Sequence, residues 1–170
     1  MNQTDPMVSF KQALRTQYGA SIEMMRRAIQ DCPDEVWDAR KGSQNSFWHI
    51  AYHTLFYLDL YIGDSDEMHK AFRGQLFHKK NDQLLRQTPS RIFTREELGG
   101  YVETVAQKTF GIIENLKPED LARRTAFPWY DLTVAEMLLN NLRHVAHHVG
   151  QLNAILRVET NKAPDWMGKG

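Results

Sequence analysis

Five of the seven histidines in this 170-residue chain lie in two short strings that are far apart in the sequence. The first string, WHIAYH, contains His49 and His53, and the second, RHVAHH, contains His144, His147 and His148. An imidazole can transfer protons near neutral pH or bind a metal ion, and a metal site needs several such groups in one place. These two strings are therefore the main candidates for a functional site.

Helical geometry decides which of these histidines can act together. At about 100° per residue, His144 and His148 are separated by about 40° around a helix, whereas His147 points to nearly the opposite side. His49 and His53 also lie one turn apart on a single face of their helix. If the two helices pack together, His49 or His53 can bring a third imidazole to the His144–His148 pair.

Three neutral imidazoles would make a site for one divalent metal ion. Zinc, nickel, iron and copper all accept such ligands, and a site with three protein ligands leaves positions for water or substrate. The ion would polarise a bound oxygen or sulfur and lower the pKa of bound water toward about 7. The alternative is a metal-free protein whose histidines are hydrogen-bonded core residues, because His-x-x-x-His pairs also occur by chance.

The spacing of apolar residues predicts four helices that would position these histidines. The predicted helices cover about 8–30, 46–62, 95–116 and 134–159. The second follows an N-cap at Asn45 or Ser46 and is apolar on nearly every face, so we expect it to be central and buried. Capping boxes that start at Thr94 and Thr133 open the third and fourth helices.

The predicted fold class is all-α, a four-helix bundle with a long crossover between helices 2 and 3. Apolar residues from Leu138 to Leu156 repeat at four-three spacing, which is the seam of near-parallel helix packing. Residues 63–93 carry glycine and proline breakers and form the crossover, in which we expect His69 and His78 to be solvated. One domain over residues 1–170 is expected, because two would each have a marginal core.

Composition narrows the classes of partner. The chain has 21 basic and 21 acidic residues, so no long-range field favours nucleic acid or anionic lipid, and we expect a small-molecule partner. Cys32 is the only cysteine, which excludes an intramolecular disulfide and suits a reducing compartment. The start of the sequence lacks a signal-peptide pattern, and the apolar stretch 47–62 is too short and polar for a membrane span. We therefore expect a cytoplasmic protein.

A few other residues have chemical interpretations that compete with structural ones. Asp59 and Glu136 are either acceptors for a ligand imidazole or ordinary helix carboxylates, with Glu136 serving its capping box. Cys32 is either a nucleophile or a buried bystander. The tail 162–170 must dock through Trp166 or fray.

Many aromatic residues lie near the histidines in the sequence and suit either a pocket for an apolar substrate or plain core packing. They are Phe47, Trp48, Tyr52, Phe56, Tyr57, Trp129 and Tyr130. An aromatic-rich surface on the crossover would also support a homodimer.

Two segments resemble motifs of the DinB-like (YfiT-like) family of metal-dependent four-helix-bundle proteins. They are NSFWHIAYHTLFYLDLY at 45–61 and LRHVAHHVGQLNAIL at 142–156. The second is the more specific, since the family typically ends with His-x-x-x-His followed by Gly-Gln. The resemblance implies a metal between helices with His144 and His148 as ligands. The third ligand maps best onto His53, with His49 as the rival.

The resemblance leaves the reaction open. Relatives include thiol-dependent transferases and isomerases as well as proteins called hydrolases, and fold alone does not settle function. Val149 departs from the pattern, because many members carry arginine there. Our leading hypothesis is a metalloenzyme that activates water or a low-molecular-weight thiol against a small electrophile. The rival is a non-catalytic, stress-related metal or ligand binder.

Overall fold

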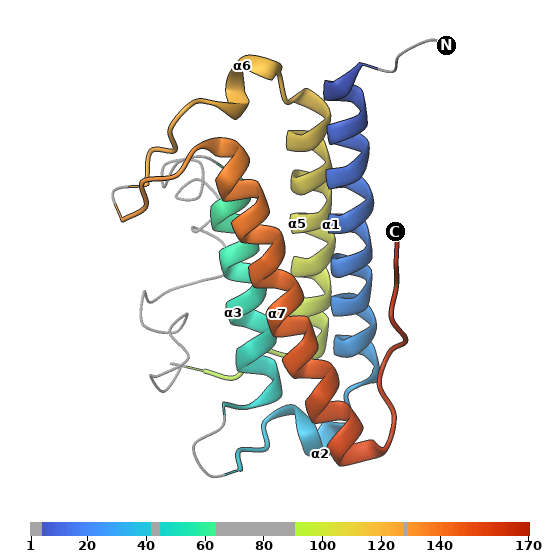
Figure 1. Ribbon diagram of the computed structural model, residues 1–170. Helices are drawn as coiled ribbons and strands as arrows, with labels where there is room; N and C mark the ends of the chain where they lie inside the picture. The colour runs from blue at the N-terminus through green and yellow to red at the C-terminus, as the bar shows by residue number, and fades with distance from the viewer. Residues whose placement is uncertain (1–4, 42–44, 64–90, 128) are drawn as a thin grey trace.

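The computed structural model describes residues 5–41, 45–63, 91–127 and 129–170 and is all-helical over these ranges (Figure 1). Its helices are α1 Pro6–Asp31, α2 Asp34–Trp37, α3 Phe47–Ile62, α5 Arg95–Asn115, α6 Pro118–Leu121 and α7 Val134–Thr160. The long helices α1, α3, α5 and α7 pack side by side, which confirms the predicted bundle. Most of the predicted crossover, including His69 and His78, lies outside the described residues.

The helix starts follow the capping signals of the sequence. Thr94 accepts a hydrogen bond from the Glu97 N–H, and the Glu97 carboxylate accepts one from the Thr94 N–H. Thr133 and Glu136 form the same reciprocal pair at α7, so the capping role of Glu136 is confirmed. Ser46 is the N-cap of α3. The short helices α2 and α6 were not predicted, because four residues are too few for a periodic pattern.

Helix α3 is the centre of the core, as its apolar sequence predicts. It packs against both α5 and α7, and 14 of its 16 residues are buried. The two half-buried residues are His53 and Tyr57, which lie one turn apart on the same face. The only side of α3 that is not fully enclosed is therefore the side that carries a histidine.

A charged group inside the bundle ties α3 to α5. Asp59 is 1% exposed, and its carboxylate accepts hydrogen bonds from Lys108 Nζ at 2.5 Å and from the Tyr101 hydroxyl at 3.0 Å. Lys108 Nζ also donates to the Asp59 carbonyl at 2.8 Å. These contacts account for Asp59 without a metal, in place of the suggested role beside a ligand imidazole.

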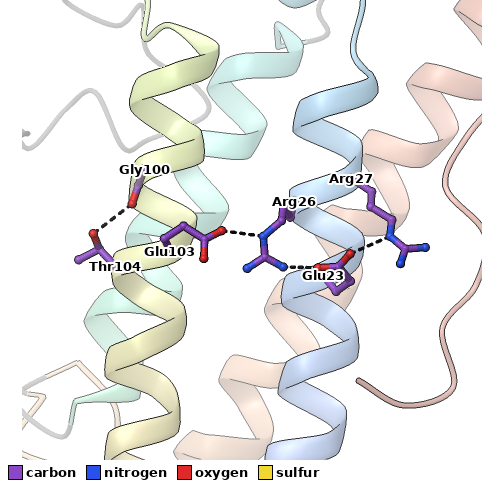
Figure 2. A network of polar contacts seen from close by, with 6 residues as sticks. All are labelled: Glu23, Arg26, Arg27, Gly100, Glu103 and Thr104. Carbon is purple, nitrogen blue, oxygen red and sulfur yellow. Dashed lines mark hydrogen bonds and ion pairs between the residues drawn. The ribbon is translucent and has the colours of Figure 1, made fainter.

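A second polar network joins α1 to α5 near the surface (Figure 2). Arg26 donates to Glu103 on α5 at 2.6 Å and pairs with Glu23 on its own helix, which also pairs with Arg27. The Glu103 side chain is 56% exposed. Solvent screens such a pair, so it contributes little stability compared with the buried Asp59–Lys108 pair.

The C-terminal segment lies along α1 (Figure 1). The Gly170 N–H donates to the Thr16 carbonyl at 3.2 Å, and Gln17 Nε2 donates to the Gly168 carbonyl at 3.2 Å. Trp166 is 81% exposed, so neither expected alternative, docking through Trp166 or fraying, holds. The tail docks through these hydrogen bonds, through Pro164, which is buried, and through Met167, which packs against the core. No helix in the described ranges is both long and apolar enough to cross a membrane.

We predict that removing one member of the buried pair costs far more than removing one member of the surface pair. Asp59→Leu should lower the free energy of unfolding by about 3 kcal/mol, because Lys108 is left buried without its partner. Glu103→Ala should cost less than about 1 kcal/mol. Asp59→Leu combined with Lys108→Met should recover much of the loss. Urea denaturation measures all four proteins, and equal losses for Asp59→Leu and Glu103→Ala would contradict this account.

Candidate metal centre

Packing of α3 against α7 brings three histidines together. The Nε2 atoms of His53 and His144 are 3.3 Å apart. The ring of His148 lies 4.8 Å from that of His53 and 4.5 Å from that of His144, measured between centroids. One ring nitrogen of each residue lies within 4.8 Å of the other two. The three imidazoles therefore form one compact cluster.

The same packing leaves the two neighbouring histidines outside the cluster. His49 is fully buried one turn before His53, and its ring lies 5.4 Å from that of Trp48. His147 is exposed on α7, as the helical-wheel argument predicts. The structure thus brings His53, rather than His49, to the His144–His148 pair.

Gln151 orients one of the three imidazoles. Its Oε1 lies 2.7 Å from Nδ1 of His148, one turn earlier on α7. Because a carboxamide oxygen only accepts, Nδ1 carries the proton and the lone pair is on Nε2. The sequence motif contains this glutamine, and its i, i+3 spacing from His148 is the signal in the sequence for this hydrogen bond.

Burial keeps His144 and His148 uncharged. Together with the neighbouring His148, His53 and His147, burial lowers the pKa of His144 from 6.5 to about 3. Burial also lowers the pKa of His148, although the hydrogen bond to Gln151 opposes that shift. At neutral pH both rings are therefore neutral imidazoles, the form that binds metals.

Tyr57 forms one wall of the cluster. Its ring centroid is 4.7 Å from that of His53 and 5.6 Å from that of His144. It lies at i+4 from His53, which places the two side chains on one face of α3. That spacing is visible in the sequence, but the contact with His144 comes only from the packing of α3 on α7.

The family model of the DinB superfamily matches residues 17–152, a range that contains all three histidines. The chain belongs to the DinB superfamily. A solved structure, that of the DinB-like protein YjoA from Bacillus subtilis, is similar with a TM-score of 0.57 at 16% sequence identity. The alignment covers 96% of this chain and 99% of YjoA, so the two share a fold. A search of curated proteins finds no match.

The donor set of this DinB chain fits a divalent ion. His144 Nδ1 is buried and has no hydrogen-bond partner within the described part of the chain, and the other nitrogen of that ring, Nε2, lies 3.3 Å from Nε2 of His53. Three imidazoles gathered in this way can bring several ring nitrogens to one ion. Among the residues described, no carboxylate or cysteine joins the cluster.

The cysteine alternative has little support in this DinB fold. Cys32 is 2% exposed at the end of α1, and burial raises the pKa of its thiol to about 12. A thiol with that pKa is almost wholly protonated at neutral pH and is a poor nucleophile. Cys32 is therefore a core residue.

We predict that the metal-free protein loses stability as the pH falls below 6.5. Between pH 6.5 and about 3, His144 is protonated in the unfolded chain but stays neutral in the folded protein, where its imidazole is buried. Stability therefore falls with falling pH, by up to about 1.4 kcal/mol per pH unit for one full proton.

Urea denaturation between pH 7 and pH 5 in the presence of a chelator measures this slope. His144→Leu should reduce it, while His147→Leu removes an exposed histidine and is the matched control. An unchanged slope in His144→Leu would show that this imidazole is not a source of the pH dependence.

Proposed function

We propose that His53, His144 and His148 hold one divalent metal ion, either zinc, nickel or iron. We further propose that the chain is a metalloenzyme of the thiol-transferase or hydrolase type, acting on a small electrophilic substrate. The observation that carries the proposal is the convergence of three imidazoles from α3 and α7. The ion would supply Lewis acidity, which lowers the pKa of a coordinated thiol or water.

The residues of the chain would each have a distinct part in binding the ion. His53 and His144 present their Nε2 atoms toward each other across the α3–α7 contact. Gln151 holds His148 in the tautomer that leaves Nε2 available. Tyr57 covers two of the rings and limits the access of water from that side.

The donor set favours activation of a thiol over activation of water. Hydrolysis needs a base near the ligands to accept a proton from water. No Asp, Glu or Cys among the described residues belongs to the cluster, and Asp59 is occupied by Lys108 and Tyr101. A thiol has a pKa near 8.5, so it needs less assistance to ionise at neutral pH.

The number of protein ligands in the cluster favours a catalytic ion over a purely structural one. Structural sites usually have four protein ligands, whereas catalytic sites keep a position open for substrate. Within the described ranges the cluster has three candidate ligands, and His49 is not one of them. A fourth protein ligand found in the loaded protein would turn the assignment toward a non-catalytic metal binder.

We predict that His148→Ala lowers the affinity for zinc at least tenfold, whereas His147→Ala leaves it near that of the wild type. Only His148 lies in the cluster, although the two are adjacent in the sequence. Metal content after purification without a histidine tag, together with competition against a chromogenic chelator, measures both variants. Equal losses would mean that zinc binds to surface histidines.

We also predict that Gln151→Leu weakens zinc binding by about 10- to 100-fold without altering the free energy of unfolding of the metal-free protein by much. Loss of the partner that orients a ligand imidazole typically has an effect of that size. Gln107→Leu on the exposed face of α5 is the matched control. If zinc affinity is the same in both variants, Gln151 does not position His148.

A further inference from the structure

A run of aromatic rings continues from the histidine cluster toward the surface. Beyond Tyr57 the next ring is Tyr61, one turn further along α3, at 5.4 Å between centroids. Tyr61 in turn contacts Phe127 at 5.4 Å and Tyr130 at 5.6 Å, both from the segment between α6 and α7. Trp129 lies 5.5 Å from Phe127. We call Tyr57, Tyr61, Phe127, Trp129 and Tyr130 the aromatic wall.

The aromatic wall is buried at its base and exposed at its outer end. Tyr61 and Phe127 are 7% and 2% exposed, whereas Trp129 and Tyr130 are 52% and 39% exposed. The segment that carries the exposed rings lies beside the end of α3, where Phe127 and Tyr130 contact Tyr61 (Figure 1). Exposed aromatic rings that are held by packed ones form a preformed apolar surface, which is a common feature of ligand sites.

Among the described residues, the charged groups that flank the aromatic wall in the sequence pair with each other, because Arg124 Nη1 lies 3.0 Å from the Asp131 carboxylate. Burial raises the pKa of Tyr61, and the other groups that shift this pKa are Tyr130, Trp129 and Tyr57. A charged ligand would lose its hydration here without gaining an ion pair from these groups, whereas a neutral ligand would not incur that cost.

We propose that the aromatic wall binds a neutral small molecule with a planar aromatic or conjugated group, and so selects the substrate of the histidine site. This inference rests on the proposed function, because the polar end of the molecule would reach the ion while its planar part stacks on the wall. Stacking on aromatic rings adds attraction beyond that from the burial of apolar area. Trp129 and Tyr130 are then the residues that determine specificity.

The test measures binding, not turnover. We titrate 2-naphthol, which is uncharged at neutral pH, into the full-length protein with and without zinc and measure Kd by calorimetry. Trp129→Ala and Tyr130→Ala should each raise Kd about fivefold or more. Trp166→Ala removes a still more exposed tryptophan from the tail and should leave Kd within about twofold of the wild-type value.

The comparison of charge uses the zinc-free protein, because a zinc ion would itself attract an anion. In that protein naphthalene-2-sulfonate, which carries the same ring with a negative charge, should bind about fivefold or more weakly than 2-naphthol. Equal affinity for the two ligands would overturn the inference. So would a Kd for 2-naphthol that Trp129→Ala and Tyr130→Ala leave unchanged. Sedimentation of the same variants separates a third outcome, in which the exposed rings join two copies of the chain and bind no small molecule.

The failure of this inference is distinguishable from the failure of the proposed function. Binding of 2-naphthol that depends on Trp129 in a protein that takes up no zinc would support the aromatic wall and reject the metal site. Tight zinc binding that depends on His148, without any binding of 2-naphthol, would do the reverse. If both hold, zinc should tighten the binding of 2-naphthol in the wild type but not in His148→Ala.

Discussion

The packing of α3 against α7 is the contact on which the candidate site depends. Helix α3 is buried on nearly every face, and its only half-buried residues are His53 and Tyr57. The half-buried residues of α3 therefore form one stripe along the helix, and His53 in this stripe faces His144 on α7. A small rotation of α3 would move that stripe away, because neighbouring residues on a helix differ by about 100° in direction.

Among the described residues, two ion pairs that tie the bundle together lie on other faces than the histidine cluster. They are Asp59–Lys108 between α3 and α5 and Arg26–Glu103 between α1 and α5. In the cluster, burial lowers the pKa values of His144 and His148, so both imidazoles are neutral at neutral pH. Side chains of low charge favour ligands that are held by coordination or by ring stacking and not by ion pairs. The proposed metal site and the aromatic wall share this property.

Membership of the DinB superfamily accounts for the bundle but not for a reaction. The similarity to YjoA, at 16% identity, concerns the fold. Function must be argued from the side chains that the fold brings together. In this chain those are three histidines, a glutamine that orients one of them, and aromatic rings that lead from the cluster to the surface. Val149, where many relatives carry arginine, is buried in the core.

Local patterns in the sequence were enough to predict the four long helices and one half of the site. Thr94 and Thr133 cap helices because their partners lie three residues away, and His144 and His148 share a face because they lie one turn apart. Such features depend only on neighbours along the chain.

Contacts between helices could not be predicted from the sequence alone. The spacing of His49 and His53 allows either to face α7, and only the packing of α3 brings His53 to the cluster. Packing also gives Asp59 its partners on α5 and leaves Trp166 exposed. The physical reason is that helical periodicity defines directions relative to one axis, whereas the rotation and depth of each helix in the bundle follow from how all the apolar faces are buried together.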